Sequence, residues 1–210
     1  MSGSLVTPQA RQRVRDLATP VATGLGRLGL TPNALTVIGF LGTAIAAVAA
    51  SLAWWLAAGL LVLAFGIFDL FDGALARATG RTTKLGAFLD STFDRAGEAL
   101  VYIGMAAGLL AAGFTAGAVL AMAAMAAAFL VSYVRAKAES LGFAPGSGMM
   151  NVGLAPREVR TAIVGVGLIL AGLVGSASTI LGGALAVIAV LATVTVIQRV
   201  LHVRAQAREG

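Results

Sequence analysis

Five of the nine acidic residues in this 210-residue chain lie between positions 69 and 98, namely Asp69, Asp72, Asp90, Asp94 and Glu98. They directly follow the apolar run WWLAAGLLVLAFGI. An ionisable group at membrane depth costs about 2.5–3.5 kcal/mol on insertion scales, so such groups usually have a function or a specific partner. The chain has no cysteine and one histidine, which excludes thiolate and histidine-rich metal sites. Any metal here would therefore be held by oxygen.

The spacing of the four aspartates is helical. Residues three or four apart share a helix face. One predicted helix has Asp69, Asp72, Gly73 and Ala76 on one face, and the next has Gly86, Asp90 and Asp94 on one face. The segment between them is short and contains Gly80 as a helix stop. We therefore expect two antiparallel neighbouring helices whose four carboxylates converge.

Four unpaired carboxylates that converge would repel one another, and a divalent cation relieves that repulsion. All-oxygen ligation suits Mg²⁺, Mn²⁺ or Ca²⁺, and with Mg²⁺ the phosphates of a substrate typically complete the coordination. The small residues on the same faces leave room for a substrate, and Arg77 offers a guanidinium to a phosphate. The pattern predicts metal-assisted phosphoryl transfer at a membrane surface.

A structural alternative pairs the aspartates with nearby basic residues as buried ion pairs, the candidates being Arg77, Arg81, Lys84 and Arg95. It explains each carboxylate singly but not why four acids and three small residues share two faces. For Glu98, one turn beyond Asp94, a structural or supporting role is favoured.

The elements that position these residues are predicted to be membrane helices. The chain is 59% hydrophobic and 11% charged, with apolar runs near the ~20 residues that a span needs. We expect an all-α, polytopic membrane protein with six transmembrane helices, at about 33–52, 54–71, 86–111, 115–134, 159–175 and 178–199. Gly104 and Gly108 form a GxxxG pair, which favours close helix packing.

Basic residues are confined to one set of links and to the two ends of the chain. The links around SLAWW, AAGFTAG and VGSAS carry none. By the positive-inside rule this predicts cytoplasmic N- and C-termini in the cell (inner) membrane, with the aspartates facing the cytoplasm. The net charge of +6 then belongs to that face, and without a soluble basic domain nucleic acid is not an expected partner.

Residues 1–31 form the first of two expected regions, ahead of a membrane catalytic domain at 32–210. Leu17, Val21 and Leu25 recur at helical spacing beside arginines, which predicts an interfacial amphipathic helix on the inner leaflet. Pro20 is expected to break this helix in two.

The aspartate region also resembles a known family. Residues 69–94 match D-x2-D-G-x2-A-R-x8-G-x3-D-x3-D, the signature of the CDP-alcohol phosphotransferases, at eight fixed positions within 26 residues. The expected six-span layout with cytoplasmic termini agrees with that family. The resemblance implies transfer of a substituted phosphate from a CDP-linked lipid to an alcohol, with CMP released.

The resemblance also implies roles for individual residues. Asp69, Asp72 and Asp90 hold one or two Mg²⁺ or Mn²⁺ ions, and Asp94, the fourth carboxylate at the metal, acts as general base for the alcohol. The nucleotide is bound by Asp69 together with Gly73, Ala76, Arg77 and Gly86. The donor implied is CDP-diacylglycerol, within the lipid bilayer.

The acceptor is predicted from a looser likeness. Segments 132–139, 155–160 and 197–199 resemble the actinobacterial phosphatidylinositol phosphate synthases, which use inositol 1-phosphate. The implied basic pocket for the phosphate of a polyol phosphate comprises Arg135 or Lys137, Arg157 or Arg160, and Arg199. For each basic residue the alternative is simply inside-face topology.

Other functions stay open at this point. Glycerol 3-phosphate is the main rival acceptor, giving phosphatidylglycerophosphate. From another class, the aspartates could serve a cation or proton transporter, although transport sites lie near the midplane and often within repeated halves. A purely structural membrane scaffold is the third reading. A homodimer is expected from the family resemblance.

Overall fold

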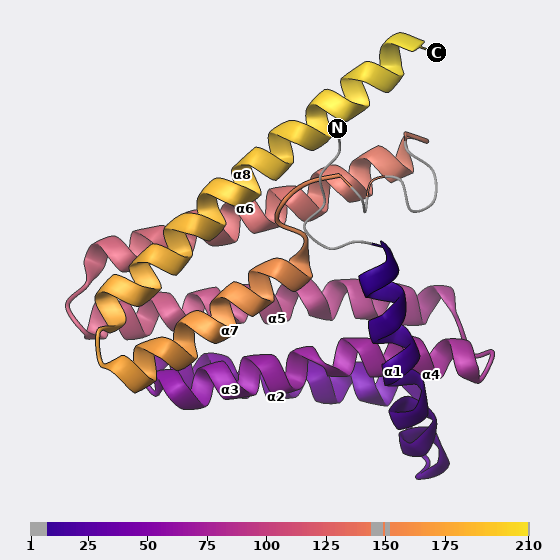
Figure 1. Ribbon diagram of the computed structural model, residues 1–210, viewed down its shortest axis with the longest axis horizontal. Coiled ribbons are helices and arrows are strands. Elements are labelled where there is room, and N and C mark those ends of the chain that lie inside the picture. The colour runs from indigo at the N-terminus through magenta and orange to yellow at the C-terminus, as the bar shows by residue number, and fades with distance from the viewer. Residues whose placement is uncertain (1–7, 144–148, 150–151, 210) are drawn as a thin grey trace.

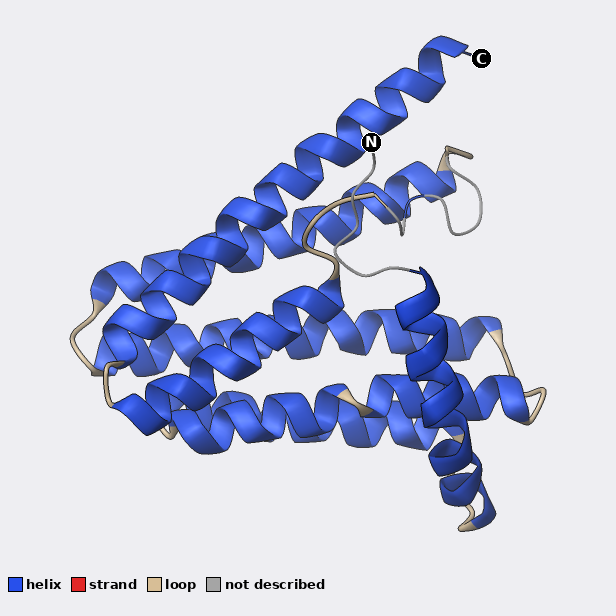
Figure 2. Cartoon of the chain, viewed as in Figure 1, coloured by secondary structure: helices blue, strands red, loops and turns tan. Residues whose placement is uncertain are grey.

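The computed structural model describes residues 8–143, 149 and 152–209, and the regular secondary structure in these ranges is helical (Figures 1 and 2). The helices are α1 (Pro8–Arg27), α2 (Pro32–Ser51), α3 (Trp55–Gly66), α4 (Phe68–Ala78), α5 (Lys84–Ala111), α6 (Thr115–Ser140), α7 (Arg157–Val174) and α8 (Ala177–Glu209). The all-α prediction is confirmed for the described part of the chain.

Four of these helical stretches are long and apolar enough to cross a membrane, namely Pro32–Ser51, Trp55–Ala78, Thr115–Ser140 and Ala177–Arg208. The protein is therefore a multi-pass membrane protein. The remaining two predicted spans correspond to α5 and α7, which lie in the same bundle but begin with charged turns (Figure 1). The six-span layout stays a prediction for those two helices.

Small residues set the distances between the helices. A Cβ on Gly104 would overlap the carbonyl oxygen of Ala47, and one on Gly108 would overlap that of Ala50. The GxxxG pair of α5 thus lies against the backbone of α2, as predicted, and these two helices share the most extensive contact in the bundle. Gly59 on α3 and Gly165 on α7 make the same kind of close approach between their helices.

The second predicted span differs from expectation at its end. It was expected to end at residue 71, but after an irregularity at Ile67 the chain continues as α4 to Ala78 (Figure 2). The helix continues because polar residues on one face can line a cavity while the opposite face packs on α1 and α2. Gly80 then adopts φ +66°, and it ends the helix as predicted.

The N-terminal helix α1 crosses the end of the bundle and packs on α4 through Ala18, Ala22 and Leu75 (Figure 1). Its Leu17 and Val21 side chains are exposed, which fits an interfacial helix. The predicted break at Pro20 is wrong, since one helix runs from Pro8 to Arg27 with Pro20 inside it. The apolar contact with α4 outweighs the one backbone hydrogen bond that proline removes. Residues 1–7 of the predicted segment lie outside the described part of the chain.

Candidate active site

Two capped helix starts bring the site together. The Thr31 hydroxyl accepts from Ala34 N at 3.2 Å, with Pro32 at the first turn of α2, and the Thr83 hydroxyl accepts from Gly86 N at 2.9 Å at the start of α5. These caps fix where each helix begins. They therefore fix which polar residues occur at this end of the bundle.

Asp72 on α4 is held by α2. The Thr36 hydroxyl donates to Asp72 Oδ2 at 2.6 Å, and the two side chains are only 8% and 4% exposed. A buried carboxylate needs such a partner, because leaving it without one is costly. The pair crosses between helices and ties the aspartate motif to the start of α2.

The aspartate helices α4 and α5 both pack against α2, and their contact with each other is slight. The sequence predicted antiparallel neighbours, and the two helices line a common cavity without packing directly on each other. A cavity of about 170 Å³ separates them, and its lining includes Asn33, Thr36, Asp72, Gly73, Ala76, Arg77, Gly86 and Asp90. Of the residues predicted to bind nucleotide, only Asp69 does not line this donor-side cavity.

A second cavity, of about 520 Å³, lies on the other side of the aspartates. Its wall contains Asp69, Asp90 and Asp94, and facing them are the basic residues Arg95, Arg135, Arg157, Arg160 and Arg199. Asp90 lines both cavities. We call this one the acceptor-side cavity. Lys137, predicted for the basic pocket, does not line it.

Arg157, the first residue of α7, joins the two walls of the acceptor-side cavity. Its Nη1 lies 2.8 Å from Asp94 Oδ1 and also donates to Asp69 Oδ2. Arg95 Nη1 contacts the other Asp94 oxygen at 3.1 Å. The Arg157 side chain is 26% exposed, so it can still be reached from the cavity. One guanidinium thus bridges an aspartate of α4 and an aspartate of α5.

Arg160 has a different environment from Arg157. It is 1% exposed and donates to both Glu98 carboxylate oxygens, at 2.7 and 2.8 Å, and to the Ala155 carbonyl at 2.7 Å. The sequence predicted a phosphate contact here, but these bonds already engage its guanidinium nitrogens. These contacts favour a structural role for Arg160 and the supporting role expected of Glu98, although Arg160 also lines the acceptor-side cavity.

Arg199 on α8 also donates hydrogen bonds to the backbone. Its Nε donates to Val152 O at 3.0 Å and its Nη1 to Val131 O at 2.5 Å, and the side chain is 3% exposed. It therefore fixes the chain between α6 and α7.

Arg135 on α6 is more accessible, with a 2.8 Å ion pair to Glu139 and 34% exposure of each side chain. Arg157 and Arg135 are thus the two members of the predicted basic pocket that remain partly exposed at the cavity.

The oxygen donors fit a divalent cation in chemistry, because carboxylates are what Mg²⁺ and Mn²⁺ prefer and a positive charge already lies between Asp69 and Asp94. As the side chains lie, no three acidic or histidine residues in the described ranges form a group that could hold a metal ion. Carboxylates of α4 and α5 nevertheless come together at Arg157, whose Nη1 contacts both Asp69 and Asp94, while Thr36 holds Asp72. A metal site shared by the four aspartates stays a prediction.

The sequence reasoning missed the contribution of α2. Asn33 and Thr36 line the donor-side cavity, three residues apart on one helix face. Polar residues on one face at the start of an otherwise apolar span were a signal that could have identified them.

The chain matches the family described as CDP-alcohol phosphatidyltransferase over residues 29–200. It is 34% identical to the archaetidylinositol phosphate synthase of Pyrococcus horikoshii over 200 residues, covering 95% of this chain and 97% of that protein. It is also 34% identical to the phosphatidylinositol phosphate synthase of Mycobacteroides abscessus over 209 residues, covering 97% of this chain and 89% of the relative.

Solved structures agree with the fold. The chain is similar, with a TM-score of 0.77 and 28% identity, to the Mycobacterium tuberculosis phosphatidylinositol phosphate synthase with CDP-DAG bound, covering 90% of this chain and 94% of that one. The same enzyme in complex with manganese and citrate also gives a TM-score of 0.77 at 28% identity, covering 89% and 88% of the two chains. With its aspartate motif and its fold, this chain belongs to the CDP-alcohol phosphatidyltransferase family of enzymes.

Proposed function

We propose that this protein transfers the phosphatidyl group of CDP-diacylglycerol to a hydroxyl of inositol 1-phosphate, giving phosphatidylinositol phosphate and CMP. The observation that carries the proposal is the 2.8 Å contact between Arg157 Nη1 and Asp94 Oδ1. It places a candidate phosphate anchor beside a candidate base. An acceptor suited to this pair carries a phosphate and a hydroxyl within a few ångströms of each other, as a polyol phosphate does.

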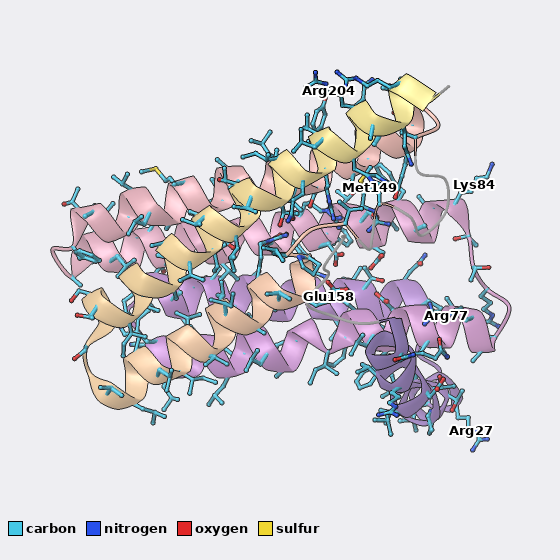
Figure 3. All side chains as sticks on the ribbon, turned by 45° about the horizontal axis from the view of Figure 1, so that its top comes forward. Arg27, Arg77, Lys84, Met149, Glu158 and Arg204 are labelled. Carbon is cyan, nitrogen blue, oxygen red and sulfur yellow. The ribbon has the colours of Figure 1, made fainter. Side chains whose placement is uncertain are left out.

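The nucleotide part of the donor is assigned to the donor-side cavity. Gly73 and Ala76 on α4 leave room there, and Arg77 projects from the next turn of the same helix end (Figure 3). Backbone close to a ligand and a guanidinium near its phosphates are features expected of a nucleotide site. The related synthase whose structure was solved with CDP-DAG bound has a similar fold.

The acceptor is assigned to the acceptor-side cavity, with Arg157 and Arg135 as anchors for its phosphate. Bidentate guanidinium contacts suit a phosphate dianion. The cavity volume of about 520 Å³ leaves ample room for a cyclic hexol, and the relatives just described are named inositol phosphate synthases. The cavity would admit glycerol 3-phosphate as well, so it is the naming of the relatives that favours inositol phosphate.

Asp69, Asp72 and Asp90, with Asp94 beside them, are the residues proposed to hold one or two Mg²⁺ or Mn²⁺ ions, and the structure of the related synthase with manganese supports this. When bound, such an ion supplies neutralisation of the charge that develops on the leaving CMP. Asp94 takes the proton of the acceptor hydroxyl, for which its contact with Arg157 must loosen. Asp72 stays fixed by Thr36.

The deciding experiment follows CMP release from purified protein given CDP-diacylglycerol and Mn²⁺ or Mg²⁺. Separate reactions contain inositol 1-phosphate, glycerol 3-phosphate, unphosphorylated inositol or serine, and one series replaces the donor with its archaeol analogue. We expect release with inositol 1-phosphate above all others, and none with the Asp94→Asn variant. Release that depends on glycerol 3-phosphate alone would overturn the acceptor assignment but not the reaction class.

A further inference from the structure

A small cavity with both polar and apolar walls lies behind Arg157, inside the bundle. It measures about 30 Å³ and lies between α2, α3, α5 and α7, with Thr43, Glu98, Tyr102, Arg157 and Thr161 in its wall. Arg157 and Thr161 also line the acceptor-side cavity, so the two spaces share a wall. About 10–15 Å³ on this measure holds one water molecule, so the cavity has room for one or two.

Two buried polar atoms at this cavity have no hydrogen-bond partner among the described residues. The first is the hydroxyl of Tyr102, a side chain only 2% exposed. It lies beside the Glu98–Arg160 pair, and no hydrogen bond of ordinary geometry joins it to either side chain. The second is Nε of Arg157, whose Nη1 is the atom that contacts Asp69 and Asp94.

Leaving such groups without a partner is unfavourable, and empty cavities in proteins are lined by apolar groups. The wall of this cavity includes Val62, Val101 and Val164, but it also contains a buried hydroxyl and a buried guanidinium N–H that lack partners. Water can both donate and accept, so one molecule can satisfy Arg157 Nε and the Tyr102 hydroxyl together.

We propose that this cavity is a binding site for ordered water, which accepts from Arg157 Nε and hydrogen bonds the Tyr102 hydroxyl. The water then fixes the guanidinium plane from behind while Nη1 contacts the aspartates in front. Tyr102 is thereby a positioning residue that acts on Arg157 through water. The hydration site itself stands independently of the acceptor assignment, whereas its effect on acceptor binding rests on the proposed function.

The first test is the thermal stability of Tyr102→Phe, compared with Tyr133→Phe as matched control. Tyr133 is the other tyrosine of the chain and is 63% exposed. A hydrated cavity predicts that Tyr102→Phe lowers the melting temperature, because the hydroxyl has a water partner to lose, while Tyr133→Phe changes little. An unchanged or raised melting temperature of Tyr102→Phe would mean that the hydroxyl has no partner and would overturn the proposal.

The second test is direct. A structure at a resolution that shows ordered water elsewhere in the bundle should show density between the Tyr102 hydroxyl and Arg157 Nε, and a dry cavity there refutes the site.

In the CMP assay, Tyr102→Phe should raise KM for the acceptor several-fold and leave KM for CDP-diacylglycerol unchanged. An unaltered acceptor KM together with clear water density would keep the hydration site and overturn the positioning role. If wild-type protein released CMP with none of the acceptors, the proposed function would be rejected. The water density and the melting temperature of Tyr102→Phe would still test the hydration site.

Discussion

Arg157 and Arg160 lie one helical turn apart at the start of α7, yet their surroundings give them separate roles. Arg157 is 26% exposed and contacts two aspartates at the edge of a cavity. Arg160 is 1% exposed, and each of its three guanidinium nitrogens donates to Glu98 or to a backbone carbonyl. At the scale of the residue, exposure and remaining hydrogen-bond capacity therefore distinguish a candidate ligand-binding cation from a structural one.

Replacing Arg157 tests its assignment to the acceptor. A hydrogen bond to a charged group contributes about 1.5–3 kcal/mol, so we expect Arg157→Gln to raise the acceptor KM by about 10- to 100-fold. Arg157→Lys should have an intermediate effect, because it keeps the charge but loses the planar fork. Initial rates of CMP release at varied acceptor concentration give these values.

Lys137→Gln is the comparison for that experiment, since Lys137 does not line the acceptor-side cavity. Its acceptor KM should stay at the wild-type value. A larger effect at Lys137 than at Arg157 would contradict our placement of the phosphate.

The Glu98–Arg160 pair should behave as a buried ion pair. Removing one partner leaves an uncompensated charge and typically costs about 3–5 kcal/mol, so Glu98→Gln and Arg160→Met should each lower the melting temperature markedly. The double variant should lose less stability than the sum of the two single losses, because it leaves no unpaired charge. Thermal unfolding in detergent measures all three, and singles as stable as wild type would argue that Arg160 is free to bind ligand.

At the scale of the element, α2 is the scaffold of the site. It lies against α5 through Gly104 and Gly108, contacts α4 along its first turns, and donates from Thr36 to Asp72. The separation of α4 and α5, and hence the donor-side cavity, follows from how closely each approaches α2. A change far from the aspartates can therefore alter the cavity.

Gly104→Ala tests this dependence. The added methyl group would overlap the Ala47 carbonyl, and overpacking of this kind costs about 1–3 kcal/mol. We expect a lower melting temperature and a higher KM for CDP-diacylglycerol, since α5 carries Asp90 into the donor-side cavity. Gly183→Ala on α8 is the matched control, with nothing within 4 Å of its added Cβ, and it should be neutral or slightly stabilising. Equal behaviour of the two variants would show that the α2–α5 contact does not govern the site.

At the scale of the whole molecule, the two ends of the bundle differ in their content of basic residues. Arg27, Arg77 and Lys84 lie at the end where α4 meets α5 (Figure 3), whereas the links at 52–54, 112–114 and 175–176 at the other end contain no basic residue. Membership of an enzyme family overturns the transporter and scaffold alternatives. The homodimer stays a prediction from the family resemblance.

The absence of native cysteine makes the orientation directly testable. We expect Ser176→Cys, in the α7–α8 link, to react with an impermeant maleimide in intact cells, and Thr82→Cys, in the α4–α5 link, to react only after the membrane is opened. Both sites lie in links between helices, so each serves as the control for the other. Labelling in the opposite order would place the aspartates on the outer face and refute the proposed localisation.

The sequence by itself determined the helical class, the membrane setting and the identity and spacing of the aspartates. Composition and periodicity are local properties, and the 3.6-residue turn places Asp69 with Asp72, and Asp90 with Asp94, in any helix that forms. The same local signals placed Gly80 at a helix end.

Only the tertiary structure decided which residues from different helices meet. Thr36 reaches Asp72 across 36 positions, Arg157 reaches Asp69 across 88, and Arg160 reaches Glu98 across 62. Arg157 and Arg160 are alike in type and close in sequence, so no local pattern could predict that the first stays partly exposed beside the aspartates while the second is buried against Glu98. That assignment depends on how α7 is rotated against α3, α5 and α8, and the rotation is set by close contacts between small residues along the whole length of the helices.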